Sequence, residues 1–351
     1  MSEKIINIDD LTRAAKHYDP VLKTLPFLQL EPVLASLGIR FLEVKDGDNI
    51  EVNFERKGGL VKPYAVSTSD KDADQSEVGK FVEMALTPKK AYCALKDHID
   101  NYETVKVLNN AGESIDQQKK NHPLERLILE SKIRTVGEDL LDAVFHSERD
   151  EDDASPMGIS DGFYTLQTDF VAAGEIATAK GNLREVGSLA APDAGDEETF
   201  VAYTNLVNWL RAQHPIFKKN AVNLYLPTGV MLNVKDAASN KYRRINHVSA
   251  SVLTEFLRED TLIKNLNIVS DACLGTGTRI FATTPGNLDY GMTKKSDKQF
   301  VQIRTPYADP NWVQFWMQFK LGQRIRVIHP KMFCMSEGSV ESLSLSGDYT
   351  S

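Results

Sequence analysis

The sequence predicts an α+β fold, and three patterns of apolar residues support this prediction. The longest pattern is helical, with apolar residues three and four positions apart along residues 122–150. Segments in which apolar and polar residues alternate, typical of half-buried strands, come before and after it. Shorter helical patterns are interspersed among these strands, so we expect helices and strands to share the core.

The composition is that of an ordinary globular protein, with 42% hydrophobic and 26% charged residues among 351. The net charge of −8 argues against a general nucleic-acid binder, because such proteins gain affinity by neutralising phosphates with Lys and Arg. The distant cysteines Cys93, Cys273 and Cys334 predict no disulfide framework and favour a reducing compartment. With no signal-like apolar run at the N-terminus and no 18-residue apolar stretch, we expect a soluble, intracellular chain without membrane spans.

Residues 1–38 contain two short helical patterns, 12–17 and 30–37, separated by prolines. This segment has too little apolar surface for a core of its own, so we expect an arm that lies on another surface.

A long hairpin follows, because residues 49–55 and 79–86 both alternate apolar and polar side chains. The intervening chain is polar, and residues 70–76 are charged and almost free of apolar side chains. An isolated hairpin is marginal in water, so we expect this one to lie on a neighbouring copy of the chain. The candidate contact residues in it are Lys57, Lys62, Asp70, Lys71, Asp72 and Asp74.

After a strand at 90–95 and a helix or turn at 97–108, the long helix begins near Pro123, a residue suited to a first helical position. Glu138 and Asp142 lie off its apolar stripe and are two further candidates for contact with another copy. The acidic run 147–153 opposes the helix dipole, which predicts that the last turn frays into a loop. The apolar face consists of Leu124, Leu127, Ile128, Leu129, Ile133, Val136, Leu140, Leu141, Val144 and Phe145.

The second half of the chain begins with a turn-rich segment at 157–178 and a domain boundary near 161–195. A helix at 197–213 is expected to turn Phe200, Tyr203, Leu206, Val207 and Leu210 inward. The remaining expected elements are strands at 223–226 and 229–234, a turn at 236–240, a helix at 248–258, strands at 266–274 and 279–284, and a strand-rich end from residue 300.

The sequence offers no catalytic constellation, and we predict no catalytic, cofactor-binding or metal-binding residues. Gly275–Thr276–Gly277 lacks the third glycine and following helix of a dinucleotide loop, which indicates a plain turn. The acids at 150–153 lack the spacing and turn glycine of a calcium loop, which indicates a solvated helix end. The three tryptophans, Trp209, Trp312 and Trp316, fit core or interface positions better than base-stacking ones.

The order of these parts resembles that of HK97-fold major capsid proteins of tailed bacteriophages. Residues 82–95 (VEMALTPKKAYCAL) look like the strand that leaves the family's extended loop, and 123–147 are similar to its spine helix. Residues 156–159 (PMGI) resemble the P-x-G-I turn after that helix. In residues 285–290 (PGNLDY), Asn287–Leu288 replaces the Asp–Phe of the family's G-D-F-x-x-Y strand. The helix 197–213 with 221–232 (AVNLYLPTGVML), and 324–333 (RIRVIHPKMF), are similar to an axial-domain unit and a closing strand.

The resemblance covers about residues 38–333 and implies a domain plan. That plan is an N-terminal arm at 1–48, an extended loop hairpin at 49–86, a peripheral domain at 87–160 with the spine helix at 123–147, a mainly axial domain at 161–299, and closing strands with a tail at 300–351.

The resemblance also implies a structural protein, not an enzyme, that assembles into hexamers and pentamers of an icosahedral shell. The implied partners are further copies, a portal, scaffolding or decoration proteins, and packaged double-stranded DNA held without sequence-specific binding. No cofactor and no membrane are implied, and the location would be the virion, assembled in the host bacterial cytoplasm. An acidic inner wall suits DNA that must slide. Some family members cross-link Lys to Asn, but no residue match here carries that chemistry over.

Two other classes of function stay open. An encapsulin-like nanocompartment shell has the same fold and encloses a cargo enzyme, although residues 1–38 show no clear cargo-docking helix. The more remote class is an α+β enzyme or binding module with an unrecognised pocket.

Overall fold

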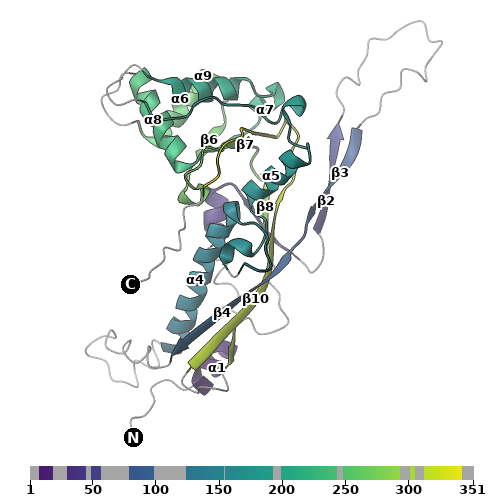
Figure 1. Ribbon diagram of the computed structural model, residues 1–351, viewed down its shortest axis with the longest axis vertical. Coiled ribbons are helices and arrows are strands. Elements are labelled where there is room, and N and C mark those ends of the chain that lie inside the picture. Colours follow the sequence, from purple (N-terminus) through teal and green to yellow (C-terminus); the bar gives the residue numbers. More distant parts are fainter. Residues whose placement is uncertain are drawn as a thin grey trace, which may run out of the picture.

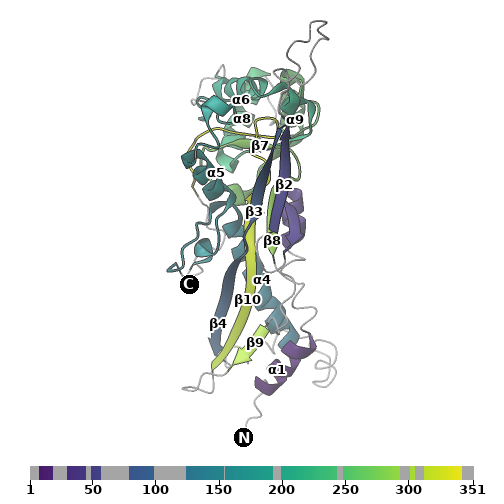
Figure 2. The same ribbon diagram turned by 90° about the vertical axis from the view of Figure 1, so that its right-hand side faces the viewer.

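The structure, a computed structural model, describes residues 8–18, 30–44, 49–56, 79–98, 124–153, 155–192, 199–242, 248–292, 301–304 and 312–341. The molecule is elongated, with a compact region at one end and a long, narrow region of strands and one long helix below it (Figure 1). A two-stranded hairpin extends from the body, and the view turned by 90° shows how thin the lower region is (Figure 2).

The larger sheet has the order β1-β8-β10-β4, with β9 also paired to β10. Its longest strand, β10 (Trp312–Ile325), pairs antiparallel with β4 (Lys89–His98), β8 (Leu288–Met292) and β9 (Val301–Arg304). The short strand β1 (Arg40–Glu43) runs parallel to β8. Along β10, Val313, Phe315, Met317 and Phe319 are buried while their neighbours are more exposed, which is the alternation expected from the sequence.

The long helix α4 (Leu124–His146) confirms the main helical prediction. Its stripe residues Leu129, Ile133, Val136, Leu140 and Val144 are all at most 4% exposed, and they share one core with the apolar face of β10. Helices α1 (Ile8–His17) and α5 (Phe163–Ala172) pack against α4. The helix ends at His146 and an irregular loop follows, as the acidic run predicts.

The compact region is built on a second sheet, of order β11-β7-β5-β6. Successive residues of its strands face opposite sides: Tyr225 stacks on Phe281 at 4.3 Å in the first core, whereas Leu224 and Ala282 belong to a second core. This sheet therefore separates two cores. Its strands are β5 (Val222–Tyr225), β6 (Leu266–Val269), β7 (Phe281–Thr283) and β11 (Phe333–Met335). The helices of the second core are α6 (Val201–Arg211), α7 (Pro215–Lys219), α8 (Thr228–Lys241) and α9 (Ala250–Thr261).

The predicted hairpin is confirmed, since β2 (Asn49–Arg56) and β3 (Gly79–Leu86) pair antiparallel over eight residues. A helix at 30–36 and short 3₁₀ helices at Pro156–Gly158, Thr178–Lys180 and Ala272–Leu274 complete the described elements. Within the part of the chain that the structure describes, no helix is long and apolar enough to cross a membrane.

Several sequence predictions are wrong, and helical periodicity explains two of them. The expected strand 229–234 and turn 236–240 both lie in α8, whose buried residues Val230, Met231, Val234, Ala237 and Ala238 recur at helical spacing. The segment 157–178, expected to be turns, contains α5. The expected strand 266–274 ends at Val269 and gives way to a 3₁₀ helix.

Two further predictions fail because of packing. Phe200 is 42% exposed, because it precedes α6 in a non-helical conformation and does not join the buried face. The described part of the N-terminal arm packs into its own subunit's core, contrary to expectation, and β1 adds a strand to the sheet. The buried apolar residues of the arm are Leu11, Ala15, Leu30, Leu34, Leu37, Ile39 and Val44.

Candidate functional site: the root of the hairpin

At the root of the hairpin, the chain leaves β3 at Leu86, crosses the large sheet and begins β4 at Lys89. Gly322 of β10 and Gly291 of β8 lie directly opposite each other beneath this crossing. A Cβ atom on Gly291 would collide with Val44 and lie 2.9 Å from Leu86 Cδ2, and one on Gly322 would lie 3.0 Å from the Thr87 carbonyl oxygen. The two glycines therefore allow the hairpin root to lie close on the sheet.

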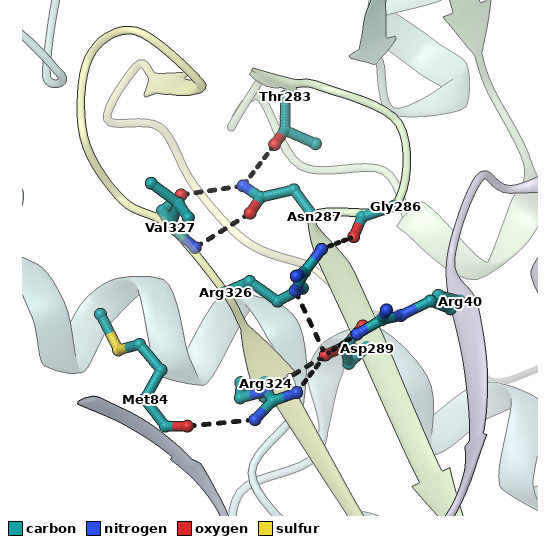
Figure 3. Close-up of polar contacts among 9 residues, drawn as sticks. All are labelled: Arg40, Met84, Thr283, Gly286, Asn287, Asp289, Arg324, Arg326 and Val327. Carbon is teal, nitrogen blue, oxygen red and sulfur yellow. Dashed lines mark hydrogen bonds and ion pairs between the residues drawn. The ribbon is translucent and has the colours of Figure 1, made fainter. Parts of the chain in front are cut away.

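A buried carboxylate lies beside this crossing on β8, the strand that also carries Gly291 (Figure 3). Asp289 of β8 is fully buried and accepts hydrogen bonds from two arginines. Arg40 donates from Nε to Oδ1 at 2.8 Å and from Nη2 to Oδ2 at 3.0 Å. Arg324 donates to Oδ2 from Nε at 3.1 Å and from Nη2 at 2.5 Å. Both carboxylate oxygens are therefore engaged by charged donors, which form the stronger class of hydrogen bond.

Strand register places these charges together. Arg40 of β1 and Arg324 of β10 are the residues directly opposite Asp289 on its two neighbouring strands. A single carboxylate on the middle strand can thus bind both flanking strands through side chains that the ladder already aligns.

The cluster also contacts the hairpin and the turn that leads into β8. Arg324 donates from Nη1 to the carbonyl oxygen of Met84 in β3 at 3.0 Å. Arg326 donates to the carbonyl oxygen of Gly286 at 3.2 Å, and its Nε lies 4.0 Å from Asp289 Oδ2. These contacts link the hairpin root to the centre of the sheet.

Asn287 fixes the turn itself. Its Nδ2 donates to Thr283 Oγ1 at 2.7 Å and to the Val327 carbonyl at 2.8 Å, while its Oδ1 accepts from the Val327 amide at 2.9 Å. Every polar atom of this amide side chain is used, which explains why a buried asparagine is tolerated here.

The arrangement supports positioning and not chemistry. Three guanidinium groups surround one carboxylate, so the cluster carries an excess of positive charge, and both oxygens of the carboxylate are engaged by cationic donors. Removing one partner of a buried ion pair leaves an uncompensated charge, so the cluster makes the geometry of the hairpin root strongly specified.

A second polar feature follows α4, where residues 147–158 double back on themselves. Glu148 and Asp150 donate backbone N–H groups to the carbonyls of Met157 and Gly158, and Arg149 donates from Nη1 to the Ile159 carbonyl at 2.9 Å. The exposed acids 150–153 border a hollow of about 750 Å³ between this loop, α4 and β4. Among the described residues, no three His, Cys, Asp or Glu side chains lie close enough to hold a metal ion.

The nearest thiol to this hollow is Cys93, which also borders it. Burial, with the nearby Asp139 carboxylate, raises the pKa of Cys93 to about 11. The thiol is therefore protonated at neutral pH and is a poor nucleophile.

Most of the contact residues predicted from the sequence fall outside the described residues: Lys57, Lys62, Asp70, Lys71, Asp72 and Asp74 all lie between β2 and β3. Glu138 is exposed on α4. Asp142 lies in α4 as well, but its side chain is outside the described part. The structure therefore brings none of these eight together in a described site.

The residues of the hairpin root were missed by sequence reasoning. The available signals were weak: a charged residue inside the apolar strand pattern at Asp289, and glycines inside two strand patterns at Gly291 and Gly322. Arg40 and Asp289 are 249 positions apart, so nothing local in the sequence connects them.

No protein-family model and no curated protein matches the sequence of this chain. Solved structures do match its fold. A chain of the satellite phage P4 procapsid that includes the size determination (Sid) protein matches with a TM-score of 0.54 at 12% identity, over 88% of this chain and 89% of that one. A chain of the capsid of the native GTA particle matches with a TM-score of 0.50 at 11% identity, over 88% of this chain and 96% of that one. The chain therefore has an HK97-like capsid fold.

Proposed function

We propose that the chain is a major capsid protein, which assembles into hexamers and pentamers of an icosahedral shell around double-stranded DNA. The observation that carries the proposal is the likeness in fold to subunits of a phage procapsid and of a GTA capsid, which extends over 88% of the chain in both comparisons. A match over 88% of the chain is too extensive to be a likeness of one common submotif.

The shape of the subunit supports the proposal. The β2–β3 hairpin projects from the body and, by the described contacts, is held only at its root (Figure 1). Ile50 on this hairpin is 58% exposed. A two-stranded ribbon is marginal by itself, so the surface that stabilises it is best supplied by a neighbouring copy.

We assign the parts of the subunit accordingly. The large sheet with α4 as its spine forms the peripheral domain, and the second core with α6 to α9 forms the axial domain near the centre of each capsomer. The extended loop comprises β2, β3 and the residues between them. Portal, scaffolding or decoration proteins and packaged DNA are the further partners, and the virion is the location.

The net charge of −8 supports DNA as contents held without tight binding, because an acidic wall repels phosphates and leaves a genome free to move. The alternative is a nanocompartment shell that encloses a cargo enzyme. Electron microscopy of purified particles, with analysis of their contents, distinguishes the two. Nucleic acid and one portal vertex support the capsid, an enzyme cargo supports the nanocompartment, and a protein that stays monomeric at high concentration contradicts both.

The hairpin provides a direct test of assembly. Replacing residues 57–78 with the two-residue turn Asn-Gly keeps the paired strands, because the shortest common hairpin loop has two residues. We therefore expect this deletion variant to give a folded subunit with an unchanged melting temperature that no longer forms stable shells. A matched variant replaces the same residues with an equal number of Gly and Ser residues, which separates loop length from side-chain contacts. Closed particles of normal stability from the deletion variant would contradict the role given to the hairpin.

Residues 70–76 test the same contact without mutation. We expect their amide exchange to be fast in free subunits and slower in particles, because a charged, apolar-poor segment gains protection only at an interface. Equal exchange in both states would remove them from the interface.

A further inference from the structure

One face of the large sheet packs against α4, whereas the opposite face is exposed along β4, β10 and β9. Phe315 and Met317 of β10 lie in the core with α4, so Gln314 and Gln318, which alternate with them, point away from it. Figure 2 shows these strands in front of α4. We call the positions that point away from α4 the outer face. They are the even-numbered residues of 90–98, 302–304 and 312–320, which the strand register places side by side.

The outer face is basic, although the whole chain is acidic, with 49 acids against 41 bases. On these described strands the outer face carries no Asp or Glu, but it carries four cations: Lys90, Lys96, Lys320 and Arg304. The acid of β4, Asp97, points to the other side, where it pairs with Lys132 of α4 at 2.7 Å. All of the four cations except Lys320 are exposed, so this face attracts an anionic surface.

Aromatic side chains lie between these cations. The ring of Tyr92 stacks on that of Trp316 with 4.9 Å between the centroids and 11° between the planes, and Tyr92 is 65% exposed. The Nζ atom of Lys96 lies over the ring of Trp312, 4.3 Å from its centroid. Both tryptophans, which the sequence places in the core or in an interface, are therefore on the outer face and not in the core.

The arrangement of the rings favours a protein over a nucleic acid. Single strands stack successive bases on several open aromatic rings, but here Tyr92 covers Trp316 and Lys96 covers Trp312. Phosphate groups are held best by arginine, and the outer face has only Arg304, whose Nη2 donates to Gln302 at 3.2 Å. One exposed tyrosine surrounded by polar and charged residues is instead the usual centre of a protein–protein contact.

The chain itself does not readily supply the acidic counterpart. The densest run of acids in the described residues is 150–153, and its carboxylates are used within their own loop. Glu151 pairs with Arg149 at 3.0 Å, and Asp153 accepts from the Ser155 amide at 2.8 Å and from its hydroxyl at 2.7 Å. The outer face also repels a second outer face, because both are basic.

We propose that the outer face docks an acidic protein other than this chain, whose surface presents carboxylates around an apolar or aromatic contact for Tyr92. The lysines meet the carboxylates, and the exposed ring of Tyr92 is the anchor. The inference goes beyond the proposed function, and it concerns a single subunit, so it does not depend on assembly.

Fluorescence anisotropy with labelled polymers tests the chemistry of the partner on the unassembled subunit. The probe is a random copolymer of Glu and Tyr, compared with polyglutamate and with oligothymidylate of similar length. We expect the copolymer to bind about tenfold more tightly than polyglutamate, because only the copolymer offers aromatic contact to Tyr92. It should also bind more tightly than oligothymidylate. Equal affinity for the copolymer and polyglutamate would overturn the proposal, and tighter binding of oligothymidylate would assign the face to nucleic acid instead.

Variants place the binding on the outer face. Tyr92→Ser should weaken copolymer binding about tenfold and leave polyglutamate binding unchanged. Lys90→Gln combined with Lys96→Gln should weaken binding of both polymers and reduce its dependence on salt. The control, Lys180→Gln combined with Lys219→Gln, removes the same charge from exposed positions outside this face and should change neither affinity. Unchanged binding by both outer-face variants would overturn the proposal.

Sedimentation velocity of the unaltered subunit without any polymer tests a second copy as the occupant. We expect Lys90→Gln with Lys96→Gln to leave its self-association unchanged. Self-association that this variant loses and the control variant keeps would assign the outer face to a contact between copies and overturn the proposal. A protein that forms no closed particles but binds the copolymer through Tyr92 would contradict the proposed function alone.

Discussion

Two aspartates lie one beside each core, and each connects three secondary-structure elements. The kinds of contact by which they do so differ. Asp289 is fully buried and joins β1, β8 and β10 through arginines. Asp260 keeps 25% of its side chain exposed and joins α6, α8 and α9, accepting at Oδ2 from Tyr203 at 2.8 Å, Tyr242 at 3.0 Å and Lys241 at 2.8 Å. Paired strands align opposite residues, so charges can meet in a dry interior. Helix ends have no such register, and there two neutral hydroxyl groups and one lysine reach a carboxylate that stays partly exposed.

The largest loss of stability is expected when the buried aspartate, Asp289, is replaced. Asp289→Asn should lower the free energy of unfolding by about 3–5 kcal/mol, because Arg324 is only 5% exposed and loses its counter-charge. Urea unfolding of the unassembled subunit measures this loss. Asp152→Asn, an exposed carboxylate on the loop after α4, is the control and should change stability by less than about 0.5 kcal/mol. A loss below about 1 kcal/mol at Asp289 would show that the ion pairs do not hold the strands.

A smaller effect should come from the glycine beside the same cluster. Gly291→Ala should cost about 1–3 kcal/mol, since its Cβ has to displace Val44 and Leu86 at the hairpin root. At Gly229 in α8 the nearest atom to an added Cβ is 3.9 Å away, so Gly229→Ala should be neutral or slightly stabilising. Equal melting temperatures for the two variants would show that Val44 and Leu86 can move away from the sheet without loss of stability.

At the solvated member of the pair we expect a loss of about 1–2 kcal/mol at pH 7 for Asp260→Asn. Burial acts to raise the pKa of Asp260, but hydrogen bonds from Lys241, Tyr203 and Tyr242 outweigh it and hold the pKa below its usual value. A depressed pKa contributes stability above the unfolded value, about 3.9, that disappears as the pH falls through the folded value. The stability gap between the two proteins should therefore close below about pH 4, and a gap that is constant with pH would contradict this account.

The smallest change in subunit stability is expected at an exposed carboxylate that lies outside both clusters. Glu138→Lys on the exposed side of α4 should change subunit stability by less than about 0.5 kcal/mol. Thermal unfolding measures this, and particle counts by microscopy report separately whether the residue faces another copy. A large loss of subunit stability would place Glu138 in an intramolecular role.

Sequence reasoning succeeded where one periodic pattern decides an element. The stripe on α4, with Ile133 and Leu140 at helical spacing, and the alternation in β2 and β3 are local signals that the folded chain keeps. It failed at α8, where Val230, Met231 and Val234 fit a short strand and a helix equally well over six residues. Such short apolar runs are ambiguous until the longer window is counted.

The hairpin root could not be predicted for a different reason. Its function depends on pairs that only the fold creates, such as Gly291 opposite Gly322 and Arg40 opposite Asp289. Taken alone, each of these residues is only a weak signal: a glycine within a strand pattern, or a charged residue within an apolar run. The 82% exposure of Leu262, which follows α9 in the left-handed conformation, could not be predicted either, because it depends on the conformation in which that helix ends.

The crossing over Gly291 and Gly322 fixes the orientation of the hairpin root relative to the large sheet. Leu86 is fully buried and Met84 is held by Arg324, so the last residues of β3 cannot swing independently of β8 and β10. A two-stranded ribbon, by contrast, twists more easily than a wide sheet. In the shell proposed above, with one subunit in rings of five and of six, any difference in hairpin direction would then arise by twisting of β2 and β3 beyond Met84, while the hairpin root keeps one angle to the sheet.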